Sequence, residues 1–81
     1  MTTKIILVEG SRSYEKDFTL PIFLSKGDLV EFGLFSFTVD SVSFFPTREE
    51  FFITCVANKQ FKTSNSESIK KILKKSGWIC S

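Results

Sequence analysis

The segment from Asp28 to Val56 constrains the fold more than any other part of the chain, because Phe and β-branched residues recur in it at strand spacing. A glycine, Gly33, stands at the natural point of reversal in its first half. Side chains alternate between the two faces of a strand, so Phe35, Phe37 and Val39 share one face while the intervening Ser and Thr share the other. The pattern predicts a β-hairpin with one buried side, which describes architecture and contains no chemistry.

The apolar phase changes within the second arm of this hairpin. Apolar residues occupy odd positions through Val39 and even positions at Val42 and Phe44. A slip of one residue turns every later side chain to the other face, so a shift inside a continuous strand indicates a β-bulge. We place it at Asp40-Ser41. Because bulges let a strand bend sharply, the shift also favours a curled sheet or small barrel.

Four further strands follow from apolar patterning. Residues 4–9 form a first strand with apolar residues on both faces, and residues 14–23 form its return, with Pro21 marking an edge or the end of regular pairing. Residues 51–57 form a strongly apolar strand that is either central or has one face at an interface. A short strand is expected at residues 60–62.

One helix is expected near the C-terminal end. Ser64 and Glu67 have the spacing of a capping box, and Gly77 stands where a glycine ends a helix. Between them, apolar residues recur at helical spacing, namely Ile69, Ile72 and Leu73. The apolar segment that starts at Trp78 is expected to fold back onto the sheet or helix. Residues 1–81 therefore predict a single α+β, mostly β, domain, with a small curled antiparallel sheet or partial barrel of five to six strands and one C-terminal helix.

The aromatic share of the chain is high for a small domain. It reaches 15%, and ten of these residues are Phe. Phe brings large buried area with no polar handle, so one reading is a compact core packed with Phe. The other reading is that ten Phe exceed the needs of one small core and that some of them line an interface.

Several function classes lack the residues they need. The chain has no His, which removes the usual nucleophile–base pairs, and its two cysteines are too few for a disulfide framework or a metal site. Cys55 is expected to be a buried thiol inside a strand. We therefore expect no enzyme, no cofactor and no metal. No apolar window is long enough to span a membrane and no secretory signal is apparent, so a cytoplasmic location is the default expectation.

Charge is divided unevenly along the chain. Residues 1–56 carry five basic and eight acidic side chains, a net charge of −3, whereas residues 57–81 carry six Lys and one Glu, a net charge of +5. Four of these lysines occupy one helix face, opposite the apolar residues: Lys70, Lys71, Lys74 and Lys75. The face is either a solvated surface that suits the negative helix C-terminus or a site for an anionic partner such as nucleic acid.

These observations favour a non-enzymatic macromolecular binding module. The first hypothesis is a small accessory or inhibitory protein, of the kind encoded by phages and mobile elements, that binds a protein partner or a second copy through a Phe-rich strand surface. Phe51 and Phe52 are its candidate contact residues. The alternative is a small nucleic-acid-binding barrel that uses the lysine-rich helix. The two differ in salt dependence, because only phosphate contacts make affinity fall steeply with salt.

Overall fold

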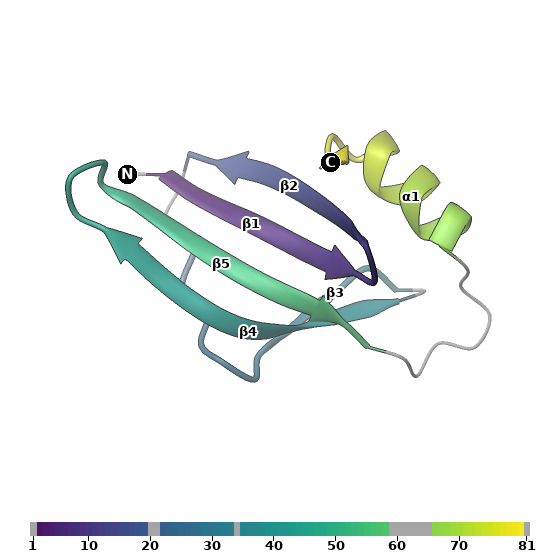
Figure 1. Cartoon of the computed structure of the whole chain (residues 1–81), viewed down its shortest axis with the longest axis horizontal. Helices are drawn as coiled ribbons and strands as arrows, with labels where there is room; N and C mark the ends of the chain where they lie inside the picture. The colour runs from purple at the N-terminus through teal and green to yellow at the C-terminus, as the bar shows by residue number, and fades with distance from the viewer. Residues whose placement is uncertain (1, 20–21, 34, 59–65, 81) are drawn as a thin grey trace.

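A computed structural model describes residues 2–19, 22–33, 35–58 and 66–80 of the chain. These residues form six strands and one helix: β1 (Thr2–Glu9), β2 (Arg12–Phe18), β3 (Leu29–Glu31), β4 (Ser36–Phe45), β5 (Glu50–Ala57), α1 (Ser66–Lys75) and β6 (Ile79–Cys80). The strands join in one sheet with the order β3-β4-β5-β1-β2-β6 (Figure 1). The predicted α+β, mostly β, class is confirmed. The short strand predicted at residues 60–62 lies outside the described residues.

The sheet is mixed and open. β1 and β5 run parallel at its centre, and all other neighbouring strands run antiparallel. The prediction was a small curled antiparallel sheet or partial barrel of five to six strands, and the parallel β1–β5 pair and the open form of the sheet correct it. Apolar spacing reveals where strands lie but not which strands meet, and here the β1–β2 and β4–β5 hairpins join through a parallel pair. β3 and β6 then remain as the two edges.

The predicted bulge is confirmed. Val39 pairs with Cys55 and Ser41 with Thr54, so the register shifts by one residue at Asp40. The shift returns Val42 to the same face as Val39, because Val42 pairs with Ile53, which shares a face with Cys55. Without the bulge, the apolar residues in the second half of β4 would face the opposite side of the sheet.

The core lies on one face of the sheet, which we call the covered face. Phe35, Phe37 and Val39 are buried there together, as predicted, at 3%, 0% and 1% exposure. The other fully buried or nearly buried apolar residues come from the central strands, α1 and the segment after it, and include Ile5, Leu7, Tyr14, Ile53, Cys55, Ile69, Leu73 and Trp78. The opposite face, which carries Lys4 and Phe52, is called the open face.

The segment after β2 crosses the covered face instead of extending the strand. The backbone N–H of Ile22 donates to the hydroxyl of Thr3, at 3.3 Å, and the side chains of Ile22 and Leu24 pack against the core. The predicted return strand over residues 14–23 was therefore wrong at its end, because β2 stops at Phe18. Ile22 and Leu24 lie beyond that point and cover the sheet, whereas Phe23 between them is exposed.

The end of α1 follows the prediction made from Gly77. Gly77 has a φ of 91°, and the backbone N–H groups of Gly77 and Trp78 donate to the carbonyls of Lys74 and Leu73. These two bonds form a Schellman motif, which satisfies carbonyls that the helix leaves unpaired. The turn directs Trp78 into the core and Ile79–Cys80 alongside β2, so the expected fold-back is confirmed. The Ser64 partner of the predicted capping box lies outside the described residues.

Candidate functional site

The β4–β5 hairpin extends beyond the part of the sheet that α1 covers. We call residues 40–52 the aromatic arm: the second half of β4, the turn at 46–49 and the start of β5. Every residue from 40 to 49 is exposed. Figure 1 shows the turn of the arm at one end of the sheet and α1 at the other. The arm therefore carries apolar side chains that do not pack into the core.

Two pairs of phenylalanines lie on the arm, one pair on each face. Phe44 and Phe51 pair across the strands on the covered-face side, with ring centroids 4.7 Å apart. Phe45 and Phe52 meet on the open face at 4.9 Å. Consecutive residues of a strand point to opposite faces, so each Phe-Phe dipeptide supplies one ring to each side. Such cross-strand aromatic contacts stabilise the hairpin and hold the rings in place.

On the covered-face side, Phe44 is exposed and Phe51 is half-buried, because the core elements do not reach this part of the arm. Phe44 is 46% exposed and its neighbour Val42 is 42% exposed, although both share a face with fully buried Ile53. α1 packs over the opposite end of the sheet (Figure 1). The result is an apolar surface that continues the core outward.

The pair on the open face is bordered by two cations. The Lys4 ammonium lies 5.6 Å from the ring centroid of Phe52, and the Arg48 guanidinium lies 5.4 Å and 5.9 Å from the rings of Phe45 and Phe52. Each such contact is worth about 0.5–1 kcal/mol at an exposed site. The cations keep the rings oriented while one side of each remains accessible, with Phe45 37% exposed.

The turn at the tip of the arm is ordered by backbone hydrogen bonds. The N–H groups of Arg48 and Glu49 donate to the carbonyls of Phe45 and Pro46, at 3.2 Å and 3.4 Å. Glu49 adopts a φ of 49°, a left-handed conformation that costs a non-glycine residue about 1–2 kcal/mol. Its carbonyl accepts a hydrogen bond from Thr2, at 3.3 Å, which ties the tip to β1.

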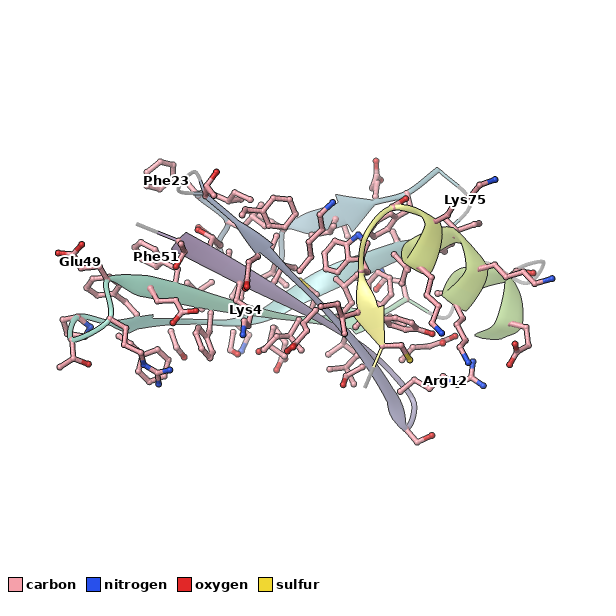
Figure 2. All side chains as sticks on the ribbon, turned by 90° about the horizontal axis from the view of Figure 1, so that it is seen from above. Lys4, Arg12, Phe23, Glu49, Phe51 and Lys75 are labelled. Carbon is pink, nitrogen blue, oxygen red and sulfur yellow. The ribbon has the colours of Figure 1, made fainter. Side chains whose placement is uncertain are left out.

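The predicted lysine face lies at the other end of the molecule. Lys71, Lys74 and Lys75 are exposed on α1 and Lys70 is half-buried. Figure 2 shows Lys75 and Phe51 at opposite ends. The six residues singled out from the sequence therefore do not form one site: the structure brings Phe51 and Phe52 into the aromatic arm and leaves the four lysines on a separate surface.

Two contacts anchor α1 to β2. Arg12 donates to Glu67 at 2.8 Å, and the Lys16 ammonium donates to the carbonyl of Ser76, also at 2.8 Å. The hydrogen bond from Arg12 lowers the pKa of Glu67, with its positive charge adding to the effect. Lys16 meets the negative end of the helix dipole. Both bonds position the helix at this end of the sheet and neither lies near the arm.

The charge of the arm is opposite to that of α1. The arm contains three acidic residues and one basic residue, namely Asp40, Glu49, Glu50 and Arg48. The net charge of the arm is therefore negative, although the groups that contact its open-face rings are the cations Lys4 and Arg48. The four lysines of α1 are not combined with the ring pairs of the arm on one surface.

Apolar patterning did not identify Phe44, Phe45 and Arg48 as candidate contact residues. The available signal was the repetition of a Phe-Phe dipeptide on both sides of a four-residue turn, which places two rings on each face of a hairpin. The exposure of these side chains could not be predicted from the sequence, because it depends on where α1 packs on the sheet.

Other chemistry is sparse in the described part of the chain. No group of three or more His, Cys, Asp or Glu side chains there is placed to hold a metal ion, and no described helix could span a membrane. Cys55 and Cys80 are not joined by a disulfide, and burial raises the pKa of Cys55 to about 11, which keeps it protonated. Comparison with known protein families, with curated proteins and with solved structures found no match.

Proposed function

We propose that this chain is a non-enzymatic binding module that docks a protein partner through the aromatic arm. The observation that carries the proposal is one exposed phenylalanine on each face of a hairpin, Phe44 and Phe45, each paired with a half-buried phenylalanine of the neighbouring strand. Exposed contiguous apolar surface is costly to keep in contact with water and marks interaction sites. Aromatic side chains also dominate the energetics of protein interfaces.

The rings of the arm are already arranged for binding. Each is held by a cross-strand partner, and the open-face pair is also held by Lys4 and Arg48. A side chain that is ordered before binding loses less conformational entropy when a partner covers it. The arm can therefore convert burial of its rings into affinity efficiently.

Charge indicates the kind of protein surface that fits. Glu49 and Glu50 flank the rings at the tip, and Asp40 lies at the base of the arm. Complementary potentials across an interface favour encounter and fix orientation. The proposed partner presents an apolar patch with basic residues where it meets the tip and the base of the arm, away from Lys4 and Arg48.

Nucleic-acid binding through α1 is the second candidate. The exposed lysines Lys71, Lys74 and Lys75 on one helix favour it. Single-stranded nucleic acid, however, is bound by combining a basic groove with aromatic rings that stack on bases. Here the two ring pairs lie in the arm, at the far end from the α1 lysines (Figure 2), and the cations that contact them are Lys4 and Arg48 instead. This separation is why we place the protein-binding function first.

The test immobilises three forms of the chain and compares which proteins each one captures from a lysate of cells that encode the chain. They are the wild type, an arm variant with Phe44→Ser and Phe45→Ser, and a helix variant with the four α1 lysines changed to Gln. We expect a protein that binds the wild type and the helix variant but not the arm variant. The binding should survive nuclease treatment and raised salt, since apolar contacts respond weakly to salt.

Measurement with the purified partner completes the test. Calorimetry should show the arm variant binding at least about tenfold more weakly, equivalent to about 1.4 kcal/mol. A melting curve followed by Trp78 fluorescence checks that all three forms are folded. Unchanged affinity in the arm variant would reject the proposal. Loss of binding in the helix variant alone, with a steep salt dependence toward oligonucleotides, would establish the nucleic-acid alternative.

A further inference from the structure

Among the described residues, nothing pairs with the outer edge of β4 along the aromatic arm. β3 pairs with β4 only from Ser36 to Thr38, and backbone bonds from Val39 to Gly27 and Asp28 extend the coverage by one residue. From Asp40 to Phe45, the structure records no backbone partner on that side within the described residues. Alternate N–H and C=O groups along this stretch are therefore directed outward and free to bond.

The opposite edge of the sheet has the usual protection against pairing. β6 covers Tyr14 and Glu15 of β2, and the strand then continues with Lys16 and Asp17, whose charges discourage another strand from docking. Between Asp40 and Arg48, the open edge of β4 carries no charged residue, and its residues 41–45 are Ser, Val, Ser, Phe and Phe. Such an edge is a template for strand addition.

We propose that the open edge of β4 pairs antiparallel with the same edge of a second copy of this chain, joining the two sheets into one. The inference rests on the proposed function in that it assigns a partner to the edge of the same aromatic arm. The faces of the arm remain available to the protein partner, so that the dimer presents two arms side by side.

A two-fold axis near Ser43 gives the longest overlap of the open edge with itself. Ser43 then lies beside Ser43 of the second copy, and Val42 lies beside the second copy's Phe44. An antiparallel pair related by a two-fold axis perpendicular to the sheet keeps equivalent faces on the same side. Phe44 and Phe51 of both copies consequently lie on the same side of the joined sheet and form one continuous apolar surface.

The charges at the two ends of the edge select this orientation. Asp40 lies at one end and Arg48 just beyond the other. Antiparallel pairing brings the Asp40 end of each copy beside the Arg48 end of the other, whereas parallel pairing would place like charges together. Glu49 and Glu50 lie on the side of β1, since the carbonyl of Glu49 bonds Thr2 and Glu50 pairs with Thr2, so they are directed away from the open edge.

The experiment measures the monomer–dimer equilibrium by sedimentation over a range of concentrations. Ser43→Lys places two like charges beside each other at the two-fold axis and is expected to raise the dissociation constant at least about tenfold. Ser11→Lys, an equally exposed serine in the β1–β2 turn, adds the same charge away from the edge and should leave the constant unchanged. A matched thermal melt confirms that both variants are folded.

Charge reversal tests the orientation. Asp40→Arg and Arg48→Asp should each weaken the dimer, and the double variant should restore it, because the two charges exchange places across the interface. Hydrogen exchange provides an independent readout: amides within residues 41–45 should become more protected as the concentration rises. If both single variants weaken the dimer and the double variant does not restore its dissociation constant, the antiparallel pairing is wrong.

The outcomes separate this inference from the proposed function. A wild-type chain that sediments at 9.2 kDa up to the highest concentration, with no protection of the edge, overturns the dimer. If that monomer still binds its protein partner through the phenylalanines, the proposed function stands. Protection of the edge that appears only on addition of a foreign protein would assign the edge to that partner's strand and reject the second copy as its occupant.

Discussion

Phe37→Ala removes the ring at the centre of the core. Phe37 is 0% exposed and contacts the rings of Phe32 and Phe35 edge-on, with centroids 5.9 Å and 6.0 Å away. A Phe→Ala change at a buried site costs about 3–5 kcal/mol, from lost transfer free energy and the cavity left behind. For a chain of 81 residues the total stability expected is about 4–12 kcal/mol. The variant should therefore lose a large part of its stability.

Urea unfolding followed by the fluorescence of Trp78 measures this loss. Trp78 is the only tryptophan, is 7% exposed and lies 6.0 Å from the ring of Phe32, so its emission reports on the same core. With an m value of about 1.5 kcal/mol per molar, a loss of 3 kcal/mol lowers the midpoint by about 2 M urea. Phe37→Leu, which fills part of the cavity, should lose about 1–2 kcal/mol and remain measurable if the Ala variant is unfolded.

Phe23→Ala is the matched control. Phe23 is 87% exposed, so the same change there should alter stability by less than about 0.5 kcal/mol. Equal midpoints for the wild type and Phe37→Ala would refute the reasoning, because the face of β4 assigned to the core would then be exposed to solvent. A loss in Phe23→Ala as large as that in Phe37→Ala would equally show that exposure does not govern the cost.

Three further predictions follow from local features. Gly77→Ala should lower the urea midpoint by an amount equivalent to about 1–2 kcal/mol, because φ is 91° there, and an unchanged midpoint would contradict the Schellman ending of α1. Arg12 lowers the pKa of Glu67. The ion pair therefore stabilises the fold fully above the ordinary pKa of 4.5, and this stabilisation is lost as the pH falls through the lowered pKa of Glu67 in the folded state. Glu67→Gln should thus show a smaller loss of stability on acidification than the wild type, and equal acid profiles would reject the ion pair. In a Cys80→Ser variant, the rate of alkylation of Cys55 near neutral pH should be limited by the rate of unfolding, because the thiol is 0% exposed and its pKa is raised to about 11. Rapid labelling of Cys55 in the native chain would contradict its burial.

The features that could be predicted from the sequence are local ones. The β4 bulge follows from a change of apolar phase between Val39 and Val42, and the end of α1 follows from Gly77, because each depends on residues a few positions apart. Burial of Phe37 follows from alternation along one strand. Such signals are present in the chain whatever the remainder of the molecule does.

The position of the candidate site was decided by tertiary structure. The residues of β5 alone do not show that it pairs parallel with β1, nor that α1 packs on the end of the sheet far from Phe44. Contacts such as Arg12 with Glu67 join residues far apart in the chain and leave no periodic signal. Phe37 and Phe44 occupy similar strand patterns, yet one is buried and the other is 46% exposed. The sequence determines which face of a strand is apolar. Burial of that face depends on which distant element packs against it, and that packing is decided by the free energy of the whole fold.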